Sequence, residues 1–315
     1  MYHKDEKITD FYKIEDELGA GSFAVVRYAV NKVTGQEVAV KIIDRKDMGE
    51  DEEVALRTEV EILSNLDHPN VVKMFEVFEA EDYLYIVLEL MTGGELFDRI
   101  VEKESYSEKE AADTIRPIVD AIRYCHENDI IHRDLKPENL LYETKEEESI
   151  IKISDFGLAR FLPSDMFAST ACGTPGYVAP EIISGKGYSS PVDVWSIGIT
   201  LYILLCGFPP FYNEDNAALF EEIKKGEFDF PEPYWDDISD MAKDLIKKML
   251  IVKASDRINI EGILDHPWVS GDDTPRKELS EVQEKIKNYN AIRKMKKATY
   301  SIMAMNRFKN ALKKD

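Results

Sequence analysis

The sequence predicts an α+β fold in which a strand-rich N-terminal part is followed by a mainly helical C-terminal part. Between residues 11 and 90, short segments of alternating apolar and polar side chains indicate strands, interrupted by one helix. After Thr92-Gly93-Gly94 the apolar residues recur at helical spacing instead. A chain of 315 residues, 44% of them apolar, can bury the core of two lobes. We therefore place the boundary between the lobes near residues 91–94.

The bulk properties exclude several classes of protein. No apolar run approaches the roughly 20 residues of a membrane span, and the polar start lacks the apolar stretch of a signal peptide. The three cysteines, Cys125, Cys172 and Cys206, lie far apart without metal-binding spacing, which indicates a reducing compartment. We expect the cytoplasm, with the nucleus as the alternative. The net charge of -21 argues against nucleic acid as a general partner.

In the N-terminal part, a first strand over 11–18 leads into a glycine-rich hairpin over 19–26. Such a hairpin can direct backbone N–H groups at a phosphate, although a lone Gly-x-Gly is more often a plain turn. The strand Val38-Ala39-Val40-Lys41 comes next, followed by a helix over 50–66 with apolar residues at helical spacing. Two further strands are predicted over 71–78 and 83–90.

In the C-terminal part, a helix opens at Glu95, and a capping-box pattern at Ser107 starts a long helix. The charge run 143–149 reads as a solvated loop between short strands. An apolar helix over 193–206 is too short for a membrane and reads as the centre of this lobe. Helices near 214–225 and 239–250 follow, and the lobe closes at Asp265-His266-Pro267-Trp268, where His266 reads as a packed residue.

The stretch from His132 to Gly157 carries the strongest functional signal. His132-Arg133-Asp134-Leu135-Lys136-Pro137-Glu138-Asn139 is followed, after an acidic insert, by Asp155-Phe156-Gly157. Asp134, Asn139 and Asp155 are side chains that can accept a proton or bind a metal. Either triplet alone would read as a surface turn or a strand end. Both together and in order make that structural reading improbable.

These motifs resemble the catalytic and metal-binding loops of the eukaryotic protein kinases, which transfer the γ-phosphate of ATP to protein hydroxyls. The resemblance implies that Asp134 accepts the proton of the substrate hydroxyl and that Lys136 neutralises the γ-phosphate. It assigns Mg²⁺ to Asn139 and Asp155, whose oxygens suit a hard cation. Lys41 would be the lysine of the family that pairs with the helix glutamate, here Glu59. Without that partner, Glu59 would read as part of a solvated helix face.

The resemblance also assigns an ATP site, with Leu88 at the back of the adenine pocket, Glu89 to Met91 as the hinge, and Ala24 where the strict pattern has its third glycine. Its expected members are Leu18, Gly19, Ala20, Gly21, Ser22, Phe23, Ala24, Val25, Val26, Ala39, Lys41, Leu88, Glu89, Met91, Glu95 and Glu138.

Residues 158–181 look like the activation segment of the kinases, with Thr170 as its phosphosite and Arg133 as the phosphate partner. An ordinary loop threonine is the alternative. The resemblance also makes Asp193 a brace for the backbone of the catalytic loop and Arg257 the partner of Glu181.

The C-terminal segment is basic and amphipathic. Residues 285–314 contain ten Lys or Arg and no Asp or Glu, whereas the rest of the chain has 30 basic and 61 acidic residues. We predict a helix over 279–312, since apolar residues recur among the lysines, and such a helix is typical of a calmodulin target or a membrane surface. Residues 287–296 are similar to the autoinhibitory region of the calcium/calmodulin-dependent protein kinases. The expected calmodulin anchors are Ile292, Met295, Ile302, Met305 and Phe308.

The sequence thus predicts a two-lobed Ser/Thr protein kinase that uses ATP and Mg²⁺, is autoinhibited by its tail and is activated by Ca²⁺/calmodulin. The expected parts are an extension over 1–10, an N-lobe over 11–92, a C-lobe over 93–268 and a regulatory tail over 269–315. We expect a monomer that phosphorylates proteins with upstream basic residues and is itself phosphorylated by an upstream kinase. Three alternatives remain: a fragment of a calcium-dependent kinase with EF-hands, a pseudokinase scaffold, and a tail packed permanently on the domain.

Overall fold

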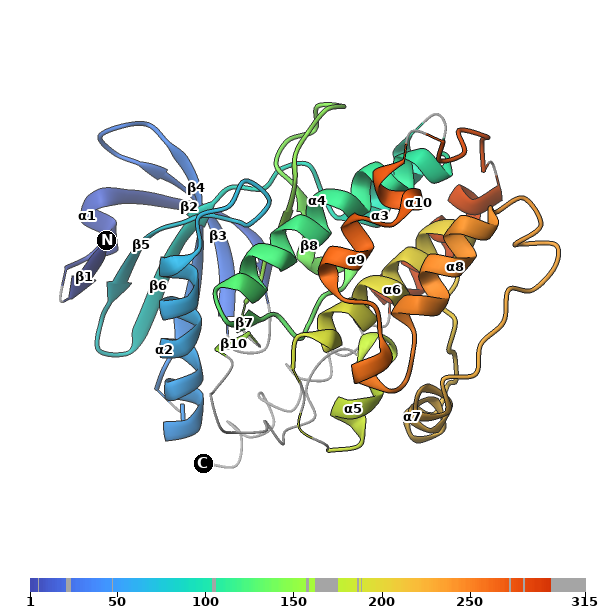
Figure 1. The fold of residues 1–315 in the computed structure, drawn as a ribbon. Helices are drawn as coiled ribbons and strands as arrows, with labels where there is room; N and C mark the ends of the chain where they lie inside the picture. The colour runs from blue at the N-terminus through green and yellow to red at the C-terminus, as the bar shows by residue number, and fades with distance from the viewer. Residues whose placement is uncertain are drawn as a thin grey trace. The chain divides into compact units, whose positions relative to one another are not determined.

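A computed structural model describes residues 1–4, 6–20, 24–46, 48–103, 106–156, 159–161, 175–185, 187, 189–271, 273–279 and 281–295 (Figure 1). The chain divides into two compact units. The first contains Met1–Asp67, Val72–Thr92 and, in the described part of the tail, residues 290–295. The second contains His68–Val71 and Gly93–Tyr289.

A six-stranded sheet forms the first unit, with strand order β1-β5-β6-β4-β3-β2. Its neighbours are antiparallel except for β1, which runs parallel to β5. The segment expected as an extension thus contributes an edge strand, and a short helix follows it. The elements are β1 (Tyr2–Lys4), α1 (Ile8–Phe11), β2 (Tyr12–Ala20), β3 (Ala24–Asn31), β4 (Glu37–Asp44), α2 (Glu50–Asn65), β5 (Met74–Glu79) and β6 (Tyr83–Glu89).

The two faces of this sheet bury different apolar clusters, because successive side chains of a strand point to opposite faces. On one face, Val38 and Val40 of β4 pack with Ile8 of α1. On the other, Ile43 of β4 packs with Leu56 of α2 and with β5 and β6. Lys41 is two residues from Ile43 and therefore points to the face that α2 covers. The sheet register in this way directs Lys41 toward that helix.

The expected strand over 71–78 begins later than predicted, at Met74. Val71 is buried and forms a parallel bridge with Ile153 of the second unit instead. A run of apolar residues does not reveal which of its members pair in one sheet and which pack elsewhere. This ambiguity is the reason for the three-residue difference.

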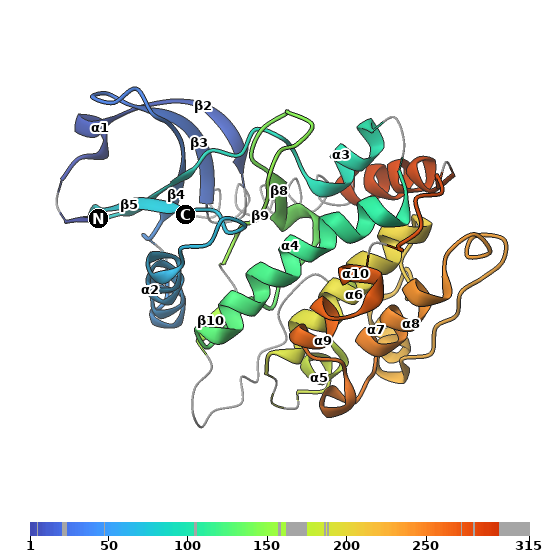
Figure 2. The same ribbon diagram turned by 45° about the horizontal axis from the view of Figure 1, so that its top comes forward.

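Helices make up most of the second unit, and α4 lies alongside α6, α9 and α10 (Figures 1 and 2). Helix α6 is its centre, with every side chain from Val192 to Cys206 buried. In the part of the chain that is described, no helix is long and apolar enough to cross a membrane. The helices are α3 (Leu96–Glu102), α4 (Glu108–Glu127), η1 (Pro137–Asn139), η2 (Pro175–Tyr177), α5 (Pro180–Ile183), α6 (Pro191–Cys206), α7 (Asn216–Lys225), α8 (Asp240–Met249), η3 (Ala254–Asp256), α9 (Ile260–Leu264) and α10 (Pro267–Ser270).

Two small antiparallel pairs complete the second unit. Strands β8 (Leu140–Tyr142) and β9 (Ile151–Ile153) enclose the charge run 143–149, which is a loop as predicted. Strands β7 (Ile130–Ile131) and β10 (Arg160–Phe161) form the other pair. The predicted tail helix is present over residues 281–295, and its expected continuation to 312 lies outside the described residues.

Candidate active site

The expected contact between Lys41 and Glu59 is present in the first unit. Strand β4 presents Lys41 and helix α2 presents Glu59, and Lys41 Nζ donates to Glu59 Oε1 at 2.6 Å. The two side chains are only 19% and 9% exposed. A pair this buried has lost much of its hydration, so removing one partner leaves a costly unpaired charge. The pair therefore fixes α2 against β4 at this point.

The strands around Lys41 place several of the predicted nucleotide-binding residues side by side. Val26 of β3 lies opposite Lys41, and Ala39 of β4 lies opposite Leu88 of β6. In the hairpin, Gly19 pairs with Val26 and Ala20 pairs with Val25. Leu18 is 51% exposed. Gly21, Ser22 and Phe23 lie outside the described residues, and Glu89 ends β6 before Met91.

Asp193 of α6 braces the catalytic loop in the second unit, as expected. Its Oδ1 accepts from the Arg133 amide at 2.8 Å, and its Oδ2 accepts from the His132 amide at 3.0 Å. Arg133 has φ 69°, a left-handed conformation that costs a non-glycine residue about 1 kcal/mol or more. The two hydrogen bonds that this fully buried carboxylate accepts hold the loop in this conformation.

His126 of α4 completes this arrangement and was not singled out from the sequence. Its Nε2 lies 2.8 Å from Asp193 Oδ2. Burial by itself would raise the pKa of Asp193, but the hydrogen bond and charge of His126, together with His132 and the Arg133 amide, lower it overall. Asp193 is therefore ionised in the fold. No local pattern links two residues 67 positions apart, so the sequence carried no signal for this contact.

Asp134, Lys136 and Asn139 form one polar cluster. Lys136 Nζ donates to Asp134 Oδ2 at 2.6 Å, and Asn139 Nδ2 donates to the Asp134 backbone oxygen at 2.8 Å. Asp134 and Asn139 are 8% and 5% exposed. The 3-10 helix η1, started by Pro137, turns the chain so that Asn139 points back at Asp134. The cluster brings together a carboxylate, a cation and an amide oxygen.

Asp155 adjoins this cluster through its neighbour Ser154, whose amide donates to the Asn139 backbone oxygen at 2.8 Å. Asp155 is exposed and has φ 58°. On its other side, Phe156 is fully buried and packs edge-on against His132 at 4.8 Å. Burial lowers the pKa of His132, which therefore stays neutral and serves as a packing residue. The two motifs, separated in sequence, are held together in one place.

The activation-segment predictions are only partly within the described chain. Thr170 lies outside the described residues. Glu181 and Arg257 form the expected pair, with Nη1–Oε1 at 2.8 Å and Nη2–Oε2 at 3.0 Å. Both side chains are buried, and the guanidinium also lies over the ring of Trp195 at 5.1 Å. This paired geometry is what arginine offers a carboxylate.

Two carboxylates expected near the substrate, Glu95 and Glu138, belong to the second unit. Glu95 is the residue before α3 and forms a bridge with Leu141 of β8, and Glu138 lies in η1 between Lys136 and Asn139. Both are partly exposed. Glu138 is thus part of the catalytic loop itself, and the bridge places Glu95 beside β8, the strand that directly follows η1.

Comparisons with known proteins agree with this geometry. Residues 12–269 match the family described as the protein kinase domain. The chain is 50% identical over 282 residues to a calcium/calmodulin-dependent protein kinase type 1 of Macrobrachium nipponense, covering 89% of this chain and 81% of that protein.

Two further relatives extend the comparison. Identity is 47% over 268 residues to myosin light chain kinase A of Dictyostelium discoideum, covering 85% of this chain and 91% of that kinase. It is 44% over 309 residues to the type IV calcium/calmodulin-dependent protein kinase of Rattus norvegicus, covering 98% and 64%. With the family's lysine–glutamate pair and catalytic loop both in place, the chain belongs to the protein kinase family and is a serine/threonine kinase of the calcium/calmodulin-dependent type.

Proposed function

We propose that this kinase is held in a low-activity state by its C-terminal helix and is released by Ca²⁺/calmodulin. The observation that supports this most directly is the packing of residues 279–289. Leu279, Val282 and Ile286 are 6%, 5% and 0% exposed, so one stripe of the helix is buried. Gln283 Nε2 donates to the backbone oxygens of Ile100 and Lys103 at 3.0 and 2.7 Å, beside α3 (Figure 2).

The helix also reaches the last part of the expected activation segment, residues 158–181. The Tyr289 hydroxyl lies 3.2 Å from the hydroxyl of Tyr177 in η2, and its ring meets Phe97 edge-on. Tyr177 lies within that segment, four residues before Glu181. A helix anchored there can hinder a peptide substrate, so the tail acts as a competitive inhibitor in cis.

We propose that calmodulin displaces the helix, because apolar residues in its C-terminal part, after Tyr289, are exposed. Ile292 and Met295 are 52% and 68% exposed, and lysine and arginine surround them. Ca²⁺-loaded calmodulin offers an acidic, methionine-rich groove that suits such a helix. Ile302, Met305 and Phe308, the other proposed anchors, lie outside the described residues. Relatives named as calcium/calmodulin-dependent kinases support the proposal.

The test measures turnover of the full chain on an arginine-containing peptide, with and without Ca²⁺/calmodulin. We expect weak activity alone and strong activation on addition. The double variant Ile292→Glu/Met295→Glu should keep the weak activity and lose most of the activation. Val33→Glu, at a residue that is 92% exposed in the turn between β3 and β4, is the matched control and should behave as wild type. Equal activity with and without Ca²⁺/calmodulin in the wild type would refute the proposal.

For the chemistry, we propose that Asp134 accepts the proton of the substrate hydroxyl while Lys136 balances charge on the transferring group. Bound MgATP supplies the γ-phosphoryl group and the cations that offset its charge. Asn139 suits a magnesium ion because its nitrogen is already used by Asp134, which leaves its oxygen for a cation. Asp155 adds an exposed carboxylate.

Asp134→Ala should reduce turnover about 10²- to 10⁴-fold, the usual contribution of a general base. Nucleotide affinity should stay near wild type, because the substitution leaves Lys41 and Glu59 intact. Turnover and nucleotide binding are measured on the same phosphatase-treated preparation. Near-normal turnover of the variant would remove Asp134 from this role.

Two finer assignments extend the proposal. Glu95 and Glu138 select arginine upstream of the acceptor, since carboxylate–guanidinium pairs discriminate against neutral residues. Equal phosphorylation of peptides with and without that arginine would contradict this. Phosphate placed on Thr170 by an upstream kinase pairs with Arg133 and raises activity. Thr170→Ala should abolish the gain that such treatment gives.

A further inference from the structure

Residues 2–4 are built into the six-stranded sheet of the first unit rather than appended to it. Strand β1 pairs with β5, with Tyr2 opposite Val77 and His3 opposite Phe78. The ring of His3 stacks on Phe78 at 4.3 Å and 7°. This side-by-side pairing fixes the direction in which Tyr2 leaves the sheet. Tyr2 is 56% exposed, yet its hydroxyl has a defined partner.

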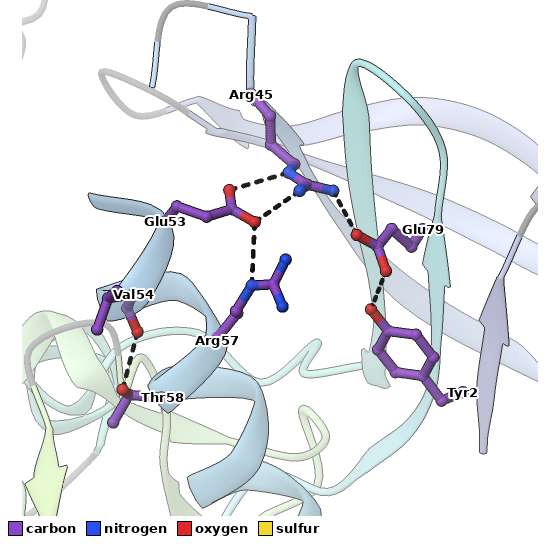
Figure 3. A network of polar contacts seen from close by, with 7 residues as sticks. All are labelled: Tyr2, Arg45, Glu53, Val54, Arg57, Thr58 and Glu79. Atoms are coloured by element: carbon purple, nitrogen blue, oxygen red, sulfur yellow. Dashed lines mark hydrogen bonds and ion pairs between the residues drawn. The ribbon is translucent and has the colours of Figure 1, made fainter. Parts of the chain in front are cut away.

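That partner is Glu79, the last residue of β5, which uses its two oxygens for two different donors (Figure 3). The Tyr2 hydroxyl donates to Oε2, and Arg45 Nη1 donates to Oε1 at 2.9 Å. Partial burial and the bond to Glu79 raise the pKa of Tyr2 to about 12. In turn the hydrogen bond from Tyr2, followed by those of Arg45, lowers the pKa of Glu79. Glu79 therefore couples the N-terminal strand to Arg45.

Arg45 carries the connection on to helix α2. Its Nη2 donates to Glu53 Oε1 at 2.5 Å and its Nε donates to Glu53 Oε2 at 3.1 Å. Arg45, Glu53 and Glu79 are 15%, 25% and 19% exposed in their side chains. Two-pronged arginine–carboxylate pairs with this degree of burial are stronger and more rigid than exposed ion pairs. Arg57 also reaches Glu53, but its side chain is 71% exposed and adds less.

Helix α2 depends on this connection at its N-terminal end. The first apolar side chain that it buries is Leu56, and Val54 in the turn before is 63% exposed. Its N-cap residue, Gly49, has no side chain to cap the helix. The Gly49 amide does donate to Glu52 Oε2 at 2.9 Å, but this bond lies within the helix end and does not join it to the sheet. Apolar packing therefore holds α2 from Leu56 onward, whereas the Arg45–Glu53 pair connects its first turn to the end of β4.

The same two elements carry the Lys41–Glu59 pair. Arg45 lies four residues after Lys41, just past the end of β4, and Glu53 lies six residues before Glu59 on α2. At 1.5 Å per residue the two glutamates are about 9 Å apart along the helix. Two ion pairs at that spacing, Lys41–Glu59 and Arg45–Glu53, fix both the distance and the tilt of α2 relative to β4. One ion pair alone cannot fix the tilt.

We propose that Arg45 and Glu53 are positioning residues for the Lys41–Glu59 pair, and that Tyr2 of strand β1 steadies them through Glu79. The inference rests on the proposed role of Lys41 and Glu59 in phosphoryl transfer. Without the Arg45–Glu53 pair the N-terminal turns of α2 move more freely relative to β4. Glu59 then holds Lys41 in the productive position for a smaller fraction of the time. The N-terminal strand is then a structural input to catalysis from outside the catalytic residues.

Glu53→Ala in the full chain is the central test, with turnover measured under saturating Ca²⁺/calmodulin. Because Glu53 acts on Glu59 only through the position of the helix, we expect turnover to fall about 3- to 30-fold, which corresponds to about 0.7–2 kcal/mol. KM for the peptide should stay unchanged. Asp51→Ala, in the same first turn but exposed, is the matched control and should retain turnover.

Tyr2→Phe removes only the outer hydrogen bond and should give a smaller loss, about 2- to 3-fold. Its control is Tyr28→Phe, because the Tyr28 hydroxyl donates to Glu37 at 2.5 Å on the same sheet and the pKa of Tyr28 is likewise raised to about 12. Tyr28 does not contact α2 through that bond. Equal losses in both variants would show a general effect on the sheet and overturn the role of Tyr2.

The Glu59→Gln background separates positioning from mere stability. If Glu53 acts through Glu59, Glu53→Ala should cost little further turnover once Glu59 is replaced. The same loss in both backgrounds, or a lower thermal midpoint with unchanged turnover, would overturn the inference. Failure of the underlying role is distinguishable, since Glu59→Gln alone would then leave turnover unchanged.

Discussion

At the scale of single residues, buried charged side chains that each bind several partners fix the geometry of the catalytic loop in the second unit. Asp193 accepts from two loop amides and from His126, and its carboxylate is 0% exposed. A buried carboxylate without such partners would cost several kcal/mol. The hydrogen bonds to Asp193 offset this cost, and two of them also hold the strained backbone at Arg133, next to the proposed base. Asp193 therefore links the folding of this loop to the position of the proposed base, Asp134.

This linkage predicts a pH dependence. The folded pKa of Asp193 lies below the ordinary 3.8, so its contribution to stability is complete above that value and is lost as pH falls through the folded pKa. Asp193→Asn should lower the thermal midpoint near neutral pH, and the difference from wild type should shrink below about pH 4. Thermal melts from pH 7 to pH 3 measure this. Asp256→Asn, an exposed aspartate beside Lys253, should show no comparable difference at any pH.

At this scale a motif that fixes both residue type and offset predicts which residues lie together, while their catalytic roles stay predictions. Asp134, Lys136, Asn139 and Asp155 were assigned from two short motifs, and the structure brings them together. His126 was missed, because its partner is 67 positions away and no local pattern relates them. The left-handed backbone of Arg133 was missed as well. Its cause is a hydrogen bond from another element and not the preference of an arginine.

At the scale of elements, periodicity located the long helices well and did not reveal the short edge strand β1. Helices α2 and α6 begin and end within a few residues of the predicted bounds, and α4 begins directly after the predicted cap at Ser107. A buried stripe marks α2 and α4, whereas α6 is an almost continuous buried run. Strand β1 spans three residues, Tyr2–Lys4, and is paired with a strand more than 70 positions away. Three residues are too few to show alternation. Its existence follows from long-range pairing that the sequence does not display.

Glu108 illustrates how one residue joins several elements. It lies inside the capping-box pattern that starts at Ser107, where an exposed side chain is expected. The structure buries it to 1% exposure, and its carboxylate accepts from Trp268 Nε1 at 2.8 Å. It also accepts from the amide and hydroxyl of Ser239, the N-cap of α8, at 2.8 and 2.7 Å. It thereby connects the start of α4 with the start of α8 and with α10.

We expect Glu108→Gln to destabilise the protein by about 1–3 kcal/mol, because the amide turns one acceptor into a donor that faces donors. The thermal midpoint should fall by several degrees, while KM for ATP and peptide stays unchanged at a temperature where the variant is folded. Glu127→Gln, at the exposed end of the same helix, should leave the midpoint unaltered. A midpoint equal to wild type for Glu108→Gln would show that these contacts contribute nothing.

At the scale of the whole molecule, the distribution of charge and the proposed regulation point the same way. A segment with ten basic residues and no acidic ones follows a body with twice as many acidic as basic residues. Unlike charges favour docking of the tail, and tethering raises its effective concentration. Packing then supplies the specificity that charge lacks, since Ile286 is fully buried and Lys285 lies over the ring of Tyr234 at 4.2 Å. The charge asymmetry was readable from sequence, whereas the contact surface was not.

Gly207 offers a way to weaken tail docking without shortening the chain. It ends α6 with φ 86°, and a Cβ there would lie 2.3 Å from Cβ of Lys285 in the tail helix. Gly207→Ala therefore forces the helix away from α6 in addition to straining the backbone by about 1 kcal/mol. If the tail is inhibitory, activity without calcium should rise several-fold, while activity at saturating Ca²⁺/calmodulin stays near wild type.

The matched control is Gly185→Ala. Gly185 has φ 61°, so alanine strains its backbone in the same way, but its Cβ would meet no atom within 4 Å. This variant should keep the low activity of the wild type in the absence of calcium, even if its thermal midpoint falls. Peptide phosphorylation with and without Ca²⁺/calmodulin, beside a melt of each variant, separates the two effects. Activation by both variants would trace the effect to strain in general. If neither variant is activated, the contact between Gly207 and the tail helix does not restrain the kinase. Displacing the helix from α6 must lower its affinity for the second unit, so an inhibitory tail would lose part of its effect.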